Sequence, residues 1–293
     1  MRQFTAVVNP TAGGATSAAA LLGVARLLRE AGAELETEYS HSLAHARELA
    51  RRAGASGRVV LAVGGDGMAG GIGGALSGTG AVLGLVPAGR GNDFARALRL
   101  PTEPAALAEV LLHGAPRPVD TIEVTSAVHE RTVVLGSVYA GVDAVANRHA
   151  NATRLLRGAA SYYVGAARAV AGWRPTRYRV TVDGEEHSFT GYTVVAANSG
   201  YYGFNRLIAP SARVDDGLLD VVMAHKAPRR LFFTLMNELA TGAHVQRPQV
   251  HVVRGREVRI EADRAIPYGA DGEVEAAVPV TAKVLPGALR VLC

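Results

Sequence analysis

The first third of the chain alternates short apolar runs with stretches whose apolar residues recur at helical spacing. The run "FTAVVNP" ends in turn residues, and Leu21, Leu22, Ala25 and Leu28 then follow at helical spacing before Gly32. This alternation is typical of a parallel sheet covered by helices. The pattern predicts strands at residues 4–10, 33–40, 58–65 and 81–89 and helices at residues 17–32, 44–55 and 104–114.

From Asp120 onward the pattern changes to short β-branched runs separated by turn residues, such as "TIEVT", "RYRVTV" and "EVRIEAD". This series predicts a mostly antiparallel β domain with two helical stretches, residues 150–171 and 229–241. We therefore expect an α/β N-terminal domain with a parallel sheet and a C-terminal antiparallel β-sandwich domain. The expected divisions are residues 1–119, residues 120–280, and a C-terminal segment, residues 281–293, that can return to the first domain.

The composition of the chain limits the kinds of functional site that it can contain. The 293 residues contain no apolar run of the ~20 residues that a membrane span needs. A single cysteine, Cys293, excludes an internal disulfide, and no Cys/His cluster has zinc-ligand spacing. The net charge is +5, yet the only lysines are Lys226 and Lys283, and neither lies in a phosphate-binding loop. Bound phosphates would therefore be held by backbone amides, arginine or a metal ion. We expect a cytoplasmic protein without a nucleic-acid partner.

Three glycine-rich turns follow predicted strands of the first domain. They are "NPTAGG" at residues 9–14, "GGDGMAGG" at residues 64–71 and "PAGRGNDF" at residues 87–94. In an open α/β sheet, ligands bind at the carboxyl ends of the strands, and glycine lets backbone N–H groups approach an anion. The three turns together predict one phosphate-binding site.

The residues Gly65, Gly67 and Gly70 also fit the Gly-x-Gly-x-x-Gly pattern of dinucleotide-binding folds. Two features argue against that interpretation: the pattern follows the third strand, and the next strand ends in proline instead of a ribose-binding acid. We expect Asp66 to meet a metal-bound nucleotide, its sugar or a water network; a turn aspartate that caps the next helix is the alternative. A helix cap is an equally good interpretation of Asn92 and the aspartate after it.

Several motifs occur in a fixed order along almost the whole chain: "NPTAGG", "GGDG", "PAGRGNDFAR", "SGYYGFNRLIAPSARVDDGLLDVV" and "ADGE". Their sequence and spacing resemble the bacterial diacylglycerol kinase and lipid kinase family. The GGDG loop is shared with NAD kinases and relates both families to the phosphofructokinase-like fold. The motifs "DDGLLDV" and "ADGE" in the β domain are what favour a lipid kinase.

The resemblance implies an ATP site between the α/β domain and the β-sandwich. Residues expected to border the nucleotide are Asn9, Pro10, Thr11, Ala12, Gly13, Ser40, Gly65, Asp66, Gly67, Met68, Ala69, Gly70, Gly71, Gly89, Arg90 and Asn92.

The resemblance also implies roles for the acids of the β domain. Asp216, with backbone carbonyls near Arg213 and Leu218, would hold a structural Mg²⁺, and Asp215 would link this ion to the active site. Glu273 resembles the family's general base, and Asp271 is close enough to compete for that role. Taken alone, the two stretches "DDG" and "ADGE" would be plain turns.

The chain departs from the family pattern on the donor side. Met68 stands where the family has threonine, Gly70 and Gly71 stand where it has asparagine and glutamate, and Arg90 replaces the threonine of the Gly-Thr-x-Asn-Asp turn. Met68 cannot donate a hydroxyl hydrogen bond, whereas Arg90 would bring a charge to the phosphates or cover the adenine face. The departures therefore concern the side of the site that would bind the phosphoryl donor.

The function that these features predict is an ATP- and Mg²⁺-dependent lipid kinase, which transfers the γ-phosphate to a hydroxyl of diacylglycerol or a related lipid at the membrane surface. NAD kinase, another small-molecule kinase of this fold, and a non-catalytic nucleotide- or lipid-binding homologue remain alternatives. The arginines and aromatics of residues 151–178 suit peripheral membrane association, although a helix packed on the sandwich is the commoner reason for such spacing. A homodimer is left open.

Overall fold

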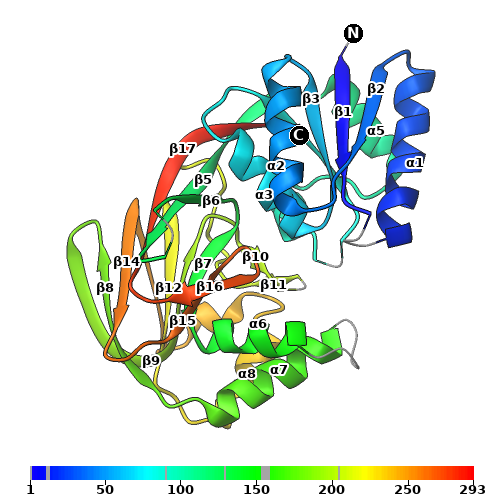
Figure 1. Ribbon diagram of the computed structural model, residues 1–293. Helices are drawn as coiled ribbons and strands as arrows, with labels where there is room; N and C mark the ends of the chain where they lie inside the picture. Colours follow the sequence, from blue (N-terminus) through cyan, green and yellow to red (C-terminus); the bar gives the residue numbers. More distant parts are fainter. Residues whose placement is uncertain (1, 11–13, 90, 129, 153–158, 204) are drawn as a thin grey trace.

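The computed structural model describes residues 2–10, 14–89, 91–128, 130–152, 159–203 and 205–293. The chain forms two lobes, an α/β lobe near the N-terminus and a β-rich lobe that carries most of the remaining chain (Figure 1). This arrangement confirms the expected fold class of a parallel α/β unit followed by antiparallel strands. Within these residues, no helix is long and apolar enough to cross a membrane.

The N-terminal lobe is built on a parallel sheet in the order β4-β3-β1-β2. Its strands are β1 (Gln3–Val8), β2 (Glu34–Tyr39), β3 (Val59–Gly64) and β4 (Val82–Pro87). Its helices are α1 (Gly14–Glu30), α2 (Leu43–Ala55), α3 (Asp66–Leu76), α4 (Asp93–Ala97) and α5 (Pro104–His113).

Two apolar layers cover the faces of this sheet. On one face, Leu28 of α1 and Leu111 of α5 pack with Phe4, all of them fully buried. On the other face, Leu49 of α2 and Ile72 of α3 pack with neighbouring strand residues. Burial of these side chains, about 1.5–3 kcal/mol each, is what holds helices of this length against the sheet.

Helix α3 is where the sequence pattern and the structure differ most. The glycine-rich run after β3 reads as a turn, yet the chain is helical from Asp66 to Leu76. Most of this helix is buried, and its glycines remove the side chains that would keep neighbours away. A Cβ on Gly73 would lie 2.7 Å from the Leu135 side chain, and a Cβ on Gly74 would overlap the carbonyl oxygen of Val133. Tertiary packing therefore outweighs the low helix propensity of glycine.

The C-terminal lobe is mostly antiparallel. Its strands are β5 (Pro116–Ser126), β6 (Thr132–Val134), β7 (Ser137–Gly141), β8 (Thr176–Val182), β9 (Glu185–Ala197), β12 (Leu219–His225), β13 (Val250–Gly255), β14 (Glu257–Ala262), β15 (Pro267–Ala270), β16 (Glu273–Ala277) and β17 (Val280–Leu292). A separate small hairpin joins β10 (Tyr201–Tyr202) to β11 (Arg206–Leu207).

The helices of this lobe pack on its sheet. They are α6 (Val142–Ala152), α7 (Ala159–Gly172), α8 (Leu231–Glu238) and the 3-10 turn η1 (Ala243–Gln246). The expected helix over residues 150–171 falls partly on residues 153–158, which lie outside the described residues, and helical structure begins earlier, at Val142. Ala166, Ala169 and Trp173 are buried in the core of the lobe, so this face of α7 packs on the sheet.

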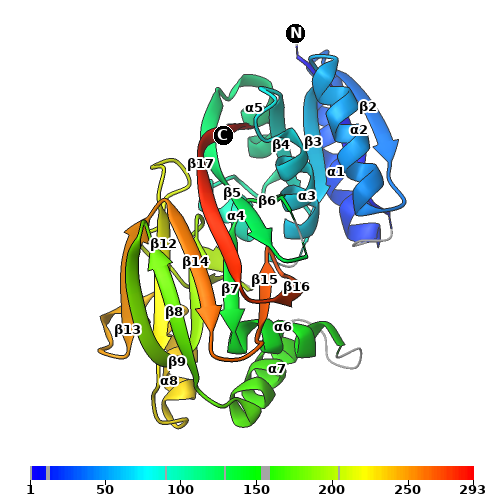
Figure 2. The ribbon, with the colours of Figure 1, turned by 60° about the vertical axis from the view of Figure 1, so that its left-hand side comes forward.

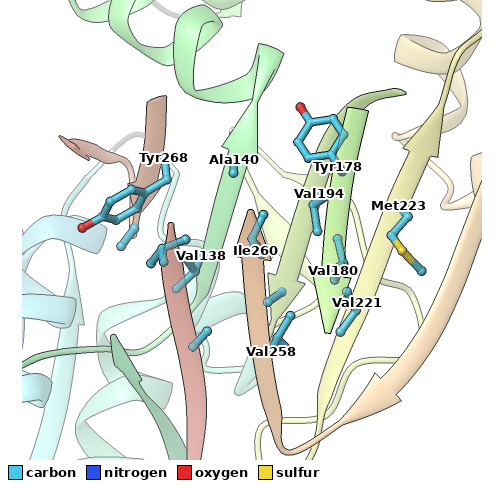
Figure 3. Close-up of a cluster of buried hydrophobic side chains, with 14 of the residues drawn as sticks. Val138, Ala140, Tyr178, Val180, Val194, Val221, Met223, Val258, Ile260 and Tyr268 are labelled. Atoms are coloured by element: carbon cyan, nitrogen blue, oxygen red, sulfur yellow. The ribbon is translucent and has the colours of Figure 1, made fainter. Parts of the chain in front are cut away.

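The main core of the C-terminal lobe is formed mostly by strand residues, with α6 and α7 packed against it, and α8 packs on the sheet in a second cluster. Figure 3 shows side chains from neighbouring strands meeting there, among them Val138, Val180, Val194, Val221 and Ile260. All five are fully buried. The alternation of buried and exposed residues along β8 follows the two-residue period of a strand with one solvated face.

Strand β17 joins the two lobes. It pairs with β14 and, over most of its length, with β5, and its last residues pair in parallel with β4: Arg290 lies opposite Val82. Figure 2 shows this strand running from the lower lobe into the upper one. A single sheet therefore continues through both lobes and fixes their relative position.

The packing of α3 generates a testable prediction. Gly74→Ala should destabilise the protein by about 2 kcal/mol, because the new methyl group meets a backbone carbonyl that cannot rotate away. The measurement is the midpoint of chemical denaturation. Gly172→Ala in α7 is the matched control: a Cβ there meets nothing within 4 Å, so this variant should be as stable as the wild type or slightly more stable. Equal stability of the two variants would contradict the packing argument.

Candidate functional site

A cleft of about 720 Å³, here called the donor cleft, lies between the lobes. Its N-terminal wall contains the start of α3, the turn after β4 and part of α2. Its C-terminal wall contains β6 and the β15–β16 turn. The described lining residues are Asn9, Thr16, Leu43, Arg47, Gly65, Gly67, Met68, Gly70, Gly71, Ala88, Gly89, Thr132, Val133, Val134, Ala270, Asp271 and Glu273.

Seven of the sixteen residues predicted to border a nucleotide are brought together here. Those that line the donor cleft are Asn9, Gly65, Gly67, Met68, Gly70, Gly71 and Gly89. Others have different positions: Pro10 is exposed, Ala69 is buried, and Ser40 is buried with its hydroxyl donating to the carbonyl oxygen of Val8 at 3.2 Å. Thr11, Ala12, Gly13 and Arg90 lie outside the described residues. The nucleotide-binding role of the whole set remains a prediction.

Two glycine turns meet at the base of this cleft. A Cβ on Gly89 would overlap the Cα of Gly65, so glycine at position 89 permits this approach. Asn92 holds the second turn: its Oδ1 accepts from the Gly89 amide, and its Nδ2 donates to the Gly89 carbonyl, both at 2.9 Å. The side chain of Asn92 therefore closes a turn and does not cap α4, which corrects the helix-cap interpretation.

The departures from the family pattern have a packing explanation. Met68 is buried, and its side chain lies against Gly64, where a Cβ would come within 2.8 Å of the methionine Cγ. At Gly71 a Cβ would overlap the side chain of Leu43 in α2, and at Gly70 it would lie 2.7 Å from Oδ2 of Asp271. Small residues at these positions let α2 and the β15–β16 turn approach α3.

A second cavity of about 320 Å³, here called the acid pocket, adjoins the donor cleft. Four carboxylates line it: Asp66, Asp93, Asp143 and Asp271. The two cavities share Gly67, Gly70 and Asp271 as lining residues. A phosphate held in the cleft and a group held in the pocket would therefore meet beside Asp271.

The carboxylates of Asp66 and Asp93 converge. A Cβ on Gly91 would lie 2.7 Å from Asp66 Oδ2 and 3.3 Å from Asp93 Oδ2. Burial raises the pKa of Asp66, and burial together with the charge of Asp66 raises the pKa of Asp93 to about 6. Mg²⁺ is often held by one or two carboxylates plus substrate phosphates, and a dication would relieve this repulsion. The pair therefore fits such an ion.

Asp271 is tied to the β6–β7 connection. Its Oδ2 accepts from the Leu135 amide at 2.7 Å, and its Oδ1 accepts from Gly136 at 2.7 Å and Ser137 at 3.1 Å. Burial raises the pKa of Asp271 to about 6, although these three amides favour the charged form. Glu273 is exposed and lines the donor cleft but not the acid pocket.

Asp143 was not singled out by the sequence analysis. It lies in the first turn of α6, accepts from Thr193 Oγ1 at 3.1 Å, and has a pKa raised to about 6 by burial. A third cavity of about 130 Å³, here called the apolar pocket, opens beside it between α6, α7, α8 and the sheet. Asp143 and Tyr202 line both this pocket and the acid pocket. In the sequence, the only sign of Asp143 is that it is a single acidic residue shortly after the glycine of "YAGVDAV".

The predicted metal-linked acids lie elsewhere. Asp215 pairs with Arg117 at 2.5 Å and with Arg213 at 3.4 Å, and Asp216 pairs with Arg254 and accepts from the Leu218 amide at 3.1 Å. Neither acid lines the donor cleft or the acid pocket. Their assignment as a metal-linked network, and that of Asp215 as catalytic, remains a prediction.

The raised pKa of Asp143 makes a prediction about stability. The carboxyl group of Asp143 keeps its proton to a higher pH in the folded protein than in the unfolded chain. Ionised Asp143 therefore opposes folding. The resulting loss of stability grows as the pH rises through about 6. Asp143→Asn keeps an acceptor for Thr193 and should unfold at a higher temperature at pH 7.5, by on the order of 1–2 kcal/mol after allowance for water in the pocket. At pH 3, below the ordinary aspartate pKa of about 3.9, the difference should vanish. A variant that is destabilised equally at both pH values would contradict this account.

Comparisons with known proteins show which family the chain belongs to. The model of the diacylglycerol kinase catalytic domain matches residues 3–124, and that of the YegS C-terminal NAD kinase beta sandwich-like domain matches residues 136–293. A diacylglycerol kinase of Mycobacterium tuberculosis is 32% identical over 99% of this chain and 94% of its own length. A probable YegS-like lipid kinase of Pseudomonas aeruginosa is 33% identical over 90% of this chain and 86% of its own length.

A solved structure shows the same fold. A diacylglycerol kinase from Bacillus anthracis superposes with a TM-score of 0.72 at 18% identity, covering 99% of this chain and 96% of that one. Both halves of the chain thus match domains of one kind of enzyme, in the expected order and over almost their whole length. The chain belongs to the family of diacylglycerol kinases and YegS-like lipid kinases, and it is a phosphotransferase.

Proposed function

We propose that this protein transfers the γ-phosphate of ATP, with Mg²⁺, to a hydroxyl of diacylglycerol or a related lipid at a membrane surface. The observation that carries this proposal is the order of its three cavities. The acid pocket shares lining residues with the donor cleft on one side and with the apolar pocket on the other. A phosphate donor and an apolar chain would thus be held on either side of a set of carboxylates.

The chemistry of phosphoryl transfer suits this arrangement. Such reactions need phosphate-cradling amides, a dication and a group that accepts the hydroxyl proton. The N-terminus of α3 and the Gly89 turn supply backbone amides and a favourable helix dipole. Asp66 and Asp93 would hold the Mg²⁺, which neutralises charge on the transferring phosphate.

The acid that accepts the hydroxyl proton must reach both substrates. Among the described acids, Asp271 alone lines both the donor cleft and the acid pocket. Each carboxylate oxygen has two lone-pair sites, so Oδ2, with one amide bonded, keeps a site free beside Gly70. We therefore propose Asp271 as the base and place Glu273, on the donor side, as a contact to the nucleotide.

A lipid fits the apolar pocket better than NAD does. Its lining includes Ala146, Ala166, Val170, Leu235 and Met236, a set that offers almost no hydrogen-bond partners for a sugar or a nicotinamide amide. Asp143 and Tyr202 stand where this pocket meets the acid pocket, a position suited to holding the polar end of a lipid near the reaction. NAD kinase remains the competing function.

The test is a phosphate-transfer assay with Mg-ATP, detergent-dispersed lipids and NAD as alternative acceptors. Diacylglycerol or a related lipid should be phosphorylated and NAD should not. The value of kcat should fall as the pH drops through about 6, because protonated Asp271 cannot accept a proton. Asp271→Asn should lower kcat at least ~100-fold, whereas Glu273→Gln should mainly raise KM for ATP.

Other acids of the pocket titrate in the same pH range. The fall of kcat at low pH, here called the acid limb, therefore needs a control that assigns it to Asp271. Asp93 and Asp143 also have pKa values of about 6. The residual activity of Asp271→Asn should lose the acid limb, while Asp143→Asn should keep it. Transfer to NAD alone would refute the lipid proposal, and a larger loss of kcat in Glu273→Gln than in Asp271→Asn would refute the assignment of the base.

A further inference from the structure

The donor cleft contains one cation that the proposed function has not used. Arg47 lies on α2, one turn beyond Leu43, and its side chain is half-buried. It is the sole lysine or arginine among the described residues that line the cleft. The neighbouring residues of that wall, among them Leu43 of α2 and Gly67, Gly70 and Gly71 of α3, carry no charge.

Arg47 has no ionic partner within the part of the chain that the structure describes. Arg52, on the same helix, pairs with Glu38 at 3.2 Å, and Arg58 pairs with Glu34 at 2.7 Å. A guanidinium that is partly removed from water and left unpaired carries a desolvation cost, which an anion in the cleft would offset. The only polyanion that the reaction brings to this cleft is the phosphoryl donor.

We propose that Arg47 binds the triphosphate of the donor nucleotide and supplies the charge that a lysine provides in other phosphate-binding loops. This inference rests on the proposed function of the cleft. The chain has only two lysines, and neither Lys226 nor Lys283 lines the cleft, so an arginine is the available residue type. Arg47 is a binding residue here and takes no part in proton transfer.

Equilibrium binding of Mg-ATP and of inorganic tripolyphosphate tests this role. Arg47→Met should weaken binding of both ligands about tenfold, and Arg47→Lys should recover most of the loss. In turnover, Arg47→Met should raise KM for ATP with little change in kcat. Arg51→Met, an exposed arginine one turn further along α2, is the matched control and should behave as the wild type.

The outcomes separate this inference from the proposed function. If the wild type binds and uses Mg-ATP but Arg47→Met binds both ligands normally, the role of Arg47 is refuted and the function stands. Weaker Mg-ATP binding with normal tripolyphosphate binding would place Arg47 on the nucleoside and also refute the inference. A wild type that neither binds Mg-ATP nor phosphorylates a lipid would refute the function itself.

A second inference comes from the turn that carries Asp215 and Asp216. Asp220 in β12 is fully buried; its Oδ1 accepts from Ser211 Oγ at 2.5 Å, and its Oδ2 faces Arg254 Nε at 3.3 Å. The same guanidinium reaches Asp216 through Nη2. Arg254 therefore bridges two carboxylates, one on the turn and one on the sheet.

The residues of this turn do not fit a structural Mg²⁺. Both oxygens of Asp216 already have partners: Oδ1 accepts from the Leu218 amide, and Oδ2 accepts from the Arg254 guanidinium. Asp215 is paired with Arg117 and Arg213. Asp215, Asp216 and Asp220 thus each already have a guanidinium partner. A fourth carboxylate, the buried Asp120, accepts from the Gly217 and Gly287 amides.

We infer that the Arg254 guanidinium takes the place of the structural ion that the family resemblance implies. A planar guanidinium can bind two carboxylates at once, as a dication would, and it cannot be removed by a chelator. The fold of this turn should then be independent of divalent cations, whatever the reaction itself requires.

Thermal unfolding without nucleotide tests this inference. The Tm of the wild type should be the same in excess EDTA and in excess Mg²⁺. Arg254→Met should lower the Tm by about 5–10 °C, because Asp220 stays buried without its partner. Arg256→Met, in the short link to β14, replaces an arginine whose side chain meets no carboxylate among the described residues and should have no effect. A wild-type Tm that falls in EDTA, or an Arg254→Met variant as stable as the wild type, would overturn the inference.

Discussion

The close approach of α3 to the C-terminal lobe is the constraint on which the site depends. Glycines along one side of α3 let the β6 strand and the carboxylate of Asp271 come into contact with the helix backbone. The same contact brings the N-terminus of α3, with its free amides, to the edge of the acid pocket. Larger side chains at these positions would separate the two lobes, which together form the donor cleft.

The layout of the fold could be predicted from the sequence because it rests on apolar periodicity. The parallel and antiparallel halves and most strand positions follow from that pattern. The α3 helix could not be predicted in this way. Its eleven residues include five glycines and have low helix propensity, and only burial against both lobes makes them helical. The role of Asn92 was missed for a related reason: a turn-closing side chain and a helix cap share one sequence signature.

The site itself was only partly predictable. Glycine turns mark the donor cleft, because backbone approach requires that residue type at fixed places. Asp143 and Arg47 carry no such mark, since an isolated acid or arginine on a helix is ordinary in sequence. Their positions become informative only when folding places them in cavities, one beside apolar side chains and the other without an acid to pair with.

Few positively charged side chains face the cavities, and this determines how charge is distributed in the site. The acid pocket has four carboxylates and no lysine or arginine among its described lining residues, so burial and mutual repulsion raise the pKa values of these acids. Such a pocket is costly for the folded protein and favourable for a bound dication. The donor cleft and the apolar pocket share none of their described lining residues, so the nucleotide and the lipid that we propose need not compete for space. The carboxylates between them are then the one place where both substrates, and the ion that neutralises their charge, can meet.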